Sequence, residues 1–305
     1  MLMFLLRRFL VALMVALTVM TFAFMLTRLS GDLAISIAGA NASQADVEVI
    51  RKAYGLDQPV AIQYWNWISR AAVGDFGESY FFKERVSDLI AKRLPITVTL
   101  GLCGLGLALL VSIPLGVLAA INENSGVDRA VTVFSMIGQA IPSFWLGLIL
   151  MVGLGLHLGL LPISGTGSWQ HYVMPSVVLA FTGIPALTRL TRSGMIEAMA
   201  SEYIRTARAK GLSRASIIGK HALRNAAIPV VSIAAVQLGF MLGGSIVIET
   251  VFALHGVGYL AWESIGKNDF PIVQAVVFVL SIIYIGLTLL ADLLNALLDP
   301  RLRTT

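Results

Sequence analysis

The chain has 305 residues, of which 57% are hydrophobic and 13% are charged, and its formal net charge is +5. Soluble globular domains carry about 25% charged residues, so this composition excludes a soluble protein and favours one that lies in a lipid bilayer. The single cysteine, Cys103, cannot form an internal disulfide, and no Cys or His cluster has the spacing of a zinc or iron–sulfur site. Redox proteins and structural-metal proteins are therefore excluded as well.

Uncharged apolar stretches predict six membrane spans. A bilayer core about 30 Å thick needs about 20 apolar residues in a helix. Four stretches fit one span each, at residues 9–27, 94–122, 225–248 and 270–291. The stretch 130–188 is long enough for two spans and has a polar break at residues 161–172. Because helices satisfy their own backbone hydrogen bonds in lipid, the sequence predicts an all-α polytopic membrane protein.

The basic residues predict that both ends of the chain are cytoplasmic, since short loops rich in Lys and Arg stay inside. Arg7 and Arg8 precede the first span, and Arg301 and Arg303 follow the last. The segment between spans 4 and 5 carries eight more basic residues, namely Arg189, Arg192, Arg205, Arg208, Lys210, Arg214, Lys220 and Arg224. A cleaved signal peptide over the first span is the alternative, but the apolar run is too long and no small-x-small site closes it.

The hydrophilic segment 28–93 is extracytoplasmic in this topology and predicts three short helices. Ser43 and Asp46 form a capping box that opens the first helix, which Gly55 would end, and Pro59 begins a stretch rich in Trp and Tyr. Four apolar residues then line one face of a helix that runs into the second span: Val86, Leu89, Ile90 and Leu94. Two interpretations stay open, a scaffold on the membrane surface and a contact for a partner that delivers substrate.

The basic cytoplasmic segment, about residues 189–224, predicts two helices with a defined break. Helix-forming residues run from Glu197 to Lys210, and Gly211 is placed to end this helix in a left-handed conformation. Ser213 can cap a second helix that extends to Arg224. Contact with anionic lipid does not require such a break. The pattern therefore favours a docking element for a soluble protein.

The same segment, SEYIRTARAKGLSRASIIGKHALRNAAIP at residues 201–229, resembles the cytoplasmic loop of permease subunits of ATP-binding-cassette (ABC) importers, in the version of the dipeptide, oligopeptide and nickel group. Further matches are YGLDQPV (54–60), GDFGESY (74–80), RLPITVTL (93–100), IPLGVLAA (113–120), IPSFWLGL (141–148), LGLLPISG (158–165), ETVF (249–252), DFPIVQ (269–274) and LLDPRLR (297–303). The chain departs from the broader class in having Arg205, Thr206 and Ala207 where a Glu-Ala-Ala triplet is usual. It departs from the peptide group in having His255 and Gly256 where Pro-Gly is common.

The resemblance implies a type I ABC importer permease fold with six transmembrane helices. Residues 1–305 would form a single transmembrane permease domain, with core spans over 94–294 and a cytoplasmic coupling loop at about 193–228. The chain would form half of a pathway for di- or oligopeptides, nickel complexes, glutathione or similar solutes across the bacterial inner membrane. The implied partners are a second permease subunit, two cytoplasmic ATP-binding subunits that bind ATP and Mg²⁺, an extracytoplasmic substrate-binding protein and membrane lipid, but no nucleic acid.

The resemblance also implies which residues couple the chain to the ATPases: Glu202, Tyr203, Arg205, Ala207, Arg208, Gly211, Leu212 and Arg224. Gly211 is the hinge candidate, because a side chain there would resist a positive φ. Tyr203, Ala207 and Leu212 could supply apolar contact, and the arginines could meet an acidic surface. The residues that line the substrate pathway are not identified by the sequence.

No catalytic, cofactor or metal site is predicted in this chain. A Walker A loop needs a glycine where Arg214 stands, so ATP hydrolysis is expected in partner subunits. The alternative function is a self-contained secondary transporter or channel with a basic, lipid-binding cytoplasmic loop. Such transporters usually keep an intramembrane ionisable residue, which the apolar stretches lack. Two small-xxx-small pairs, Gly155/Gly159 and Gly239/Gly243, fit packing within the chain or against a second subunit equally well.

Overall fold

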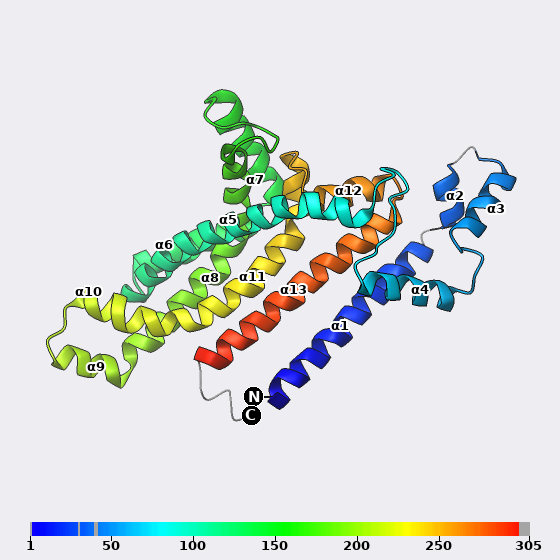
Figure 1. Cartoon of the computed structure of the whole chain (residues 1–305). Coiled ribbons are helices and arrows are strands. Elements are labelled where there is room, and N and C mark those ends of the chain that lie inside the picture. Colours follow the sequence, from blue (N-terminus) through cyan, green and yellow to red (C-terminus); the bar gives the residue numbers. More distant parts are fainter. Residues whose placement is uncertain (1, 30, 40–41, 299–305) are drawn as a thin grey trace.

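A computed structural model describes residues 2–29, 31–39 and 42–298 of the protein, and helices dominate this described part (Figure 1). Within it, five helices are long and apolar enough to cross a membrane, or six spans are present if one bent pair counts as a span. The five are α1 (Leu2–Leu29), α5 (Val86–Ile121), α8 (Val173–Ala200), α11 (Leu223–Val251) and α13 (Phe270–Leu298). The predicted all-α, polytopic class is confirmed at this level.

The bent pair replaces the straight third span expected at the start of the stretch 130–188. It consists of α6 (Gly126–Ala140) and α7 (Ser143–Leu150), which continues into a π-helical turn, η1 (Met151–His157). The two halves meet at 96°. Pro142 causes the break, because a proline forces the residue before it out of the helical region, and Ile141 is extended with ψ 124°. In Figure 1, α7 leaves the bundle at a steep angle to its neighbours.

Three long helices, α5, α8 and α11, form the tightly packed centre of the bundle. Their buried side chains belong to one apolar cluster that includes Leu100, Leu179, Leu187, Met241 and Ile248. Glycines let the backbones approach: a Cβ on Gly116 of α5 would lie 2.6 Å from Cβ of Thr191 on α8. α1 lies at the edge of this bundle and packs mainly on α13 (Figure 1).

The small-xxx-small pairs are used within the chain. A Cβ on Gly239 would collide with the ring of Tyr284 on α13, whereas Gly243 faces open space. A Cβ on Gly155 would lie 2.9 Å from Ile163, and Gly159 forms a turn with φ +60°. In this chain, Gly239 and Gly155 therefore serve intrachain packing.

The segment between α1 and α5 contains three short helices, α2 (Leu33–Ala38), α3 (Gln44–Ala53) and α4 (Val60–Ala72). The capping box at Ser43 and Asp46 is present, and α4 begins directly after Pro59, as predicted. Helix α2 was not predicted; Asp32 caps it by accepting a hydrogen bond from the backbone N–H of Ala34. The predicted apolar face at the start of α5 is also confirmed, since Val86, Leu89 and Ile90 are buried against Val257 and Leu260 of α12 (Val257–Gly266).

The molecule has two distinct ends (Figure 1). One end, called the α9 end below, holds α9 (Glu202–Ala209), α10 (Arg214–Ser216), the start of α1 and the end of α13. Here Arg8 pairs with Asp292 at 3.1 Å, and Ser232 donates a hydrogen bond to Asn295. The opposite end, called the α4 end, holds α2, α3, α4 and α12. Arg301 and Arg303, used above to predict topology, lie outside the described residues.

Candidate functional site

The predicted coupling loop begins with a helix break that the sequence did not reveal. The helix expected from Glu197 to Lys210 is two helices, because α8 ends at Ala200 and Ser201 is extended with ψ 154°. The Ser201 hydroxyl donates to the carbonyl of Ala198 at 2.5 Å, and an acidic residue, Glu202, occupies the first turn of α9. Serine competes for backbone hydrogen bonds and acidic residues favour helix N-termini, so both residues promote a new start here.

Gly211 ends α9 in the left-handed region, as predicted, with φ +73°. Its N–H donates to the carbonyl of Arg208 at 3.0 Å, and the N–H of Leu212 donates to that of Ala207 at 3.3 Å. A Cβ at Gly211 would meet nothing within 4 Å. The requirement for glycine at this position is therefore conformational rather than steric.

Ser213 caps the second helix, as predicted, by accepting a hydrogen bond from the N–H of Ser216 at 3.3 Å. This helix is longer than expected. It runs from α10 through a π-helical segment, η3 (Ile217–Ala222), into α11 without a gap. The second half of the loop is therefore the start of a membrane-spanning helix.

One face of α9 is packed against the chain itself. Ile204 and Ala207 are buried in an apolar cluster with Met195 of α8 and with Ile217 and Ala222 of η3. The side chain of Ala207 is therefore largely covered by its own subunit, and its contact with an ATPase stays a prediction. Ile204 was missed, although its spacing of three residues from Ala207 marks one helical face.

The other face of α9 and the turn after it are exposed and basic. Tyr203 and Leu212 keep 41% and 39% of their surface exposed. Arg205 and Arg208 on α9 are exposed too, as is Arg224 at the start of α11. Arg205 pairs with Glu202 at 2.8 Å in an exposed i,i+3 arrangement, which contributes little stability. This surface suits a partner whose own surface has an apolar groove surrounded by acidic groups.

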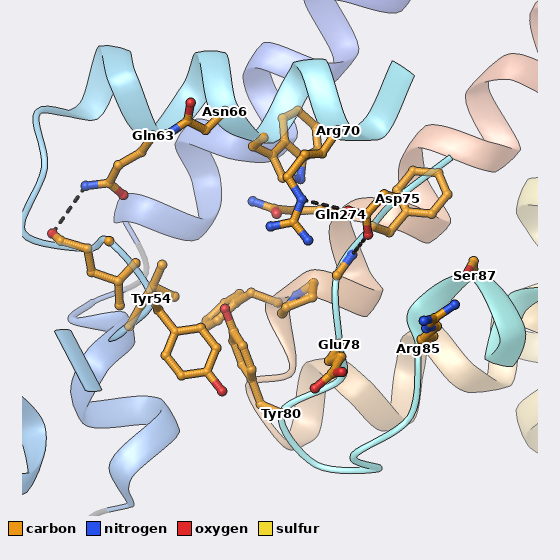
Figure 2. Close-up of a pocket in the computed structure, with 18 of the residues that line it drawn as sticks. Tyr54, Gln63, Asn66, Arg70, Asp75, Glu78, Tyr80, Arg85, Ser87 and Gln274 are labelled. Atoms are coloured by element: carbon orange, nitrogen blue, oxygen red, sulfur yellow. Dashed lines mark hydrogen bonds and ion pairs between the residues drawn. The ribbon is translucent and has the colours of Figure 1, made fainter. Parts of the chain in front are cut away.

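A polar pocket of about 830 Å³ lies at the α4 end, between α4, the end of α3, the loop before α5 and the start of α13 (Figure 2). Side chains of both charges line it, among them Arg28, Arg70, Asp75, Glu78 and Arg85, together with Tyr54, Gln63, Asn66, Tyr80 and Gln274.

Internal bonds hold the walls of this pocket. Nε of Arg70 donates to Asp75 at 2.8 Å, and Gln63 donates to the carbonyl of Gln58 at 2.7 Å (Figure 2). The hydrogen bond from Arg70 holds the pKa of Asp75 below its usual range. The rings of Tyr54 and Tyr80 meet edge to face at 5.4 Å, and burial raises the pKa of Tyr80 to about 12. These contacts join the walls of the pocket to one another, and charged groups are part of its lining.

Asp269 ties the loop of this pocket to the bundle. Its buried carboxylate accepts hydrogen bonds from the Ser79 hydroxyl at 2.5 Å and from the N–H groups of Tyr80 and Phe81 at 3.1 Å each. The motifs GDFGESY and DFPIVQ thus meet in space. Both motifs are visible in the sequence, but their contact is not, because they lie about 190 positions apart.

Glu249 forms a second buried junction at the last turn of α11. Its carboxylate accepts hydrogen bonds from the hydroxyls of Thr97 at 2.7 Å and Ser245 at 3.0 Å, and from the N–H of Tyr259 at 2.8 Å. A Cβ on Gly256 would lie 2.5 Å from both Oε2 of Glu249 and Oγ1 of Thr97. His255 lies outside the junction and stacks edge to face on Tyr259. The departure from Pro-Gly therefore leaves the essential glycine in place.

Two family models together match most of the chain. Residues 112–304 match the model described as "Binding-protein-dependent transport system inner membrane component", and residues 1–101 match the model of the N-terminal part of such membrane components. Among curated relatives, the glutathione transport system permease proteins GsiC of Salmonella choleraesuis and Escherichia coli K12 are 40% and 39% identical over 275 residues. These alignments cover 90% of this chain and 90% of each relative.

Solved structures share the fold at low sequence identity. An inward-facing structure of the MetNI methionine ABC transporter matches with a TM-score of 0.58 and 20% identity, over 69% of this chain and 96% of that chain. An amino acid ABC transporter crystallised with histidines matches with a TM-score of 0.51 and 15% identity, over 70% of this chain and 94% of that chain.

Proposed function

Because this chain belongs to the binding-protein-dependent transport system inner membrane components, we propose that its coupling loop (about residues 193–228, called the α9 loop below) couples it to cytoplasmic ATPases. The chain is thus a permease subunit of an ABC importer in the bacterial inner membrane. The observation that carries this proposal is the two-sided character of α9. Ile204 and Ala207 anchor its underside to the spans, while Tyr203 and Leu212 leave an apolar contact surface among arginines. A helix held this way transmits a displacement imposed by a bound ATPase to α8 and α11.

The proposed topology has six spans with both chain ends in the cytoplasm, and residues 1–305 form a single transmembrane permease domain. The pairing of Arg8 with Asp292 supports this arrangement, because it brings the start of α1 and the end of α13 to the α9 end. The α9 loop also carries most of the basic residues between spans 4 and 5, which favours its cytoplasmic location.

The complete importer has two permease subunits, two cytoplasmic ATP-binding subunits and an extracytoplasmic substrate-binding protein. ATP and Mg²⁺ bind to the ATP-binding subunits, so this chain takes part in transport without hydrolysing ATP itself. Six spans are too few to enclose a pathway for a peptide, which supports a second permease beside this one. Membership of a binding-protein-dependent family favours this assembly over a self-contained secondary transporter or channel.

The proposed substrates are short peptides, including di- and oligopeptides and glutathione, which is what the relatives GsiC are named for. The pocket at the α4 end supports this class, since arginines, carboxylates and tyrosine hydroxyls around about 830 Å³ suit a small solute with both charges. Residues 28–93 then serve as an extracytoplasmic scaffold or as a contact for the substrate-delivering partner.

The test is an affinity purification of the tagged chain from native membranes in mild detergent, with partners identified by mass spectrometry. The wild type is expected to recover ATP-binding subunits and a second permease. Gly211→Val is expected to lose most of the ATP-binding subunits, because a β-branched residue resists the positive φ that orients the two helices of the loop.

Gly39→Val is the matched control. Gly39 also has a positive φ, of +93°, and open space around it, but it lies at the α4 end. It should recover ATP-binding subunits as well as the wild type does. Recovery of the chain without any ATPase by the wild type, or equal recovery by the wild type and Gly211→Val, would contradict the coupling role.

A further inference from the structure

A bidentate ion pair joins α6 to α8 near the α9 end. Nε of Arg192 donates to Oδ1 of Asp128 at 2.6 Å, and Nη2 of Arg192 donates to Oδ2 at 2.7 Å. The side chain of Asp128 is only 7% exposed and that of Arg192 is 28% exposed. Paired, parallel hydrogen bonds between charged groups fix both distance and orientation, so this contact resists sliding more than an apolar contact does.

Asp128 is itself held by the turn between α5 and α6. The N–H of Asn124 donates to its Oδ2 at 2.9 Å, and its own N–H donates to the hydroxyl of Ser125 at 3.3 Å. Asn124 has φ +61°, which closes the turn. The Asp128 carboxylate, in the first turn of α6, therefore binds both the turn between α5 and α6 and the guanidinium on α8.

Arg192 lies on the part of α8 that leads to α9. One turn further on, Met195 is buried in the apolar cluster that includes Ile204 on the underside of α9. On the other side, Thr191 packs on Gly116 of α5. A displacement of α9 that moves the end of α8 therefore also moves the part of α8 whose Arg192 binds Asp128.

Helix α6 is the first half of the bent span. Its contact with α8 is polar at its start, through Asp128, and close at its far end, where a Cβ on Gly138 would lie 3.1 Å from the carbonyl oxygen of Phe181. The 96° bend into α7 follows immediately. A shift imposed at the start of α6 is therefore delivered to the bend.

We propose that the Asp128–Arg192 ion pair is the positioning contact through which movement of the α9 loop is passed to α6 and to the bent α6–α7 span. This inference rests on the coupling role proposed for α9. Neither residue touches a nucleotide or a solute in this account. They act by keeping α6 in register with α8 while the ATPases move the loop.

The experiment uses the complete importer, co-expressed with its partner subunits and reconstituted in proteoliposomes with its binding protein. ATP hydrolysis and uptake of a labelled short peptide are measured on the same samples. For Asp128→Asn we expect the assembled complex to hydrolyse ATP while uptake falls, so that the ATP consumed per peptide rises about tenfold. Arg192→Lys keeps the positive charge but loses the second of the two parallel hydrogen bonds. Its ATP consumption per peptide should lie between those of the wild type and Asp128→Asn.

Two further variants separate positioning from stability. The exchanged pair Asp128→Arg with Arg192→Asp should recover part of the coupling, since opposite charges again face each other. Asp292→Asn removes a different interhelical Arg–Asp contact at the same end and should leave the ratio unchanged. If the complex with Asp128→Asn does not assemble, the Arg192→Lys complex provides the test. More ATP consumed per peptide than in the wild type then supports the inference, and an equal value contradicts it.

The inference is overturned if hydrolysis and uptake fall in parallel, because a purely structural contact lowers the amount of active complex without changing the ATP consumed per peptide. It is also overturned if the exchanged pair is no better coupled than Asp128→Asn while assembling normally. Failure of the α9 proposal is seen separately, as a wild-type chain that recovers no ATP-binding subunits in the affinity purification.

Discussion

Single residues in this chain differ in whether their partners are near or far in the sequence. The roles of Ser43, Gly211 and Ser213 were predictable, because a cap or a left-handed turn is a property of a few neighbouring residues. Asp269 and Glu249 could not be assigned, because the hydroxyls of Ser79 and Thr97 that bind them are 190 and 152 positions away. The sequence around a buried carboxylate does not indicate which distant groups donate hydrogen bonds to it.

The Glu249 junction leads to a prediction about stability. Glu249→Ala leaves the Thr97 hydroxyl and the N–H of Tyr259 buried without their acceptor, at a cost of about 1–3 kcal/mol for each unpaired group. Glu249→Gln keeps one carbonyl oxygen as an acceptor and should lose less. Thermal unfolding of the purified complex in detergent measures both.

Ser281→Ala is the control, since Ser281 is half-buried and its hydroxyl donates a hydrogen bond to the carbonyl of Val277 one turn earlier in the same helix. The midpoint temperature of its thermal unfolding should match that of the wild type. Equal midpoints for the wild type and Glu249→Ala would show that the junction does not stabilise the fold.

At the scale of elements, sequence patterns located the helices but not the breaks within them. The apolar stretches predicted α1, α5, α8, α11 and α13, because burial in lipid requires length and apolar side chains. The break at Ser201 was missed, and the 96° angle at Pro142 could not be predicted, since both depend on how the helices pack on α8 and α11. Proline marks where a helix can break, but it does not give the angle.

Helix α9 offers a test in which two adjacent residues behave differently. Ile204→Ala removes a buried side chain and should cost about 2–5 kcal/mol locally, which loosens α9 from the bundle. Limited proteolysis in the loop should then be faster than in the wild type. Tyr203→Ala leaves the underside intact, so proteolysis should be unchanged while recovery of ATP-binding subunits falls.

The opposite pattern would reverse the assignment of the two faces. If Tyr203→Ala speeds proteolysis and Ile204→Ala only weakens ATPase recovery, Tyr203 is the anchor and Ile204 the contact. Both variants are compared at equal amounts of chain in the membrane, so that differences in expression do not enter.

For the whole molecule, the proposed topology predicts which surfaces face each side of the membrane. In a Cys103→Ser background, a cysteine at Asn66 on α4 should react with a membrane-impermeant maleimide in intact spheroplasts. A cysteine at Ala215 in α10 should react only in inverted vesicles. Both positions are exposed, so access to the reagent depends on the side of the membrane alone. Labelling of Ala215→Cys from outside would invert the topology.

The family could be predicted for the whole chain from short motifs spread along it, and both family models confirm it. The pocket at the α4 end could not, because its walls come from α3, α4, the loop before α5 and the start of α13. Segments so far apart meet only once the bundle has formed.

The bent span also bears on how the cell makes this protein. Helix α7 begins at Ser143, directly after Pro142, without a side-chain cap, and Phe144, Trp145 and Leu148 on it are exposed. In lipid, backbone groups without a partner cost several kcal/mol each, so this end of α7 needs protein against it. A copy inserted alone would expose this end of α7 to lipid, so the chain is expected to complete its folding only beside a neighbouring subunit.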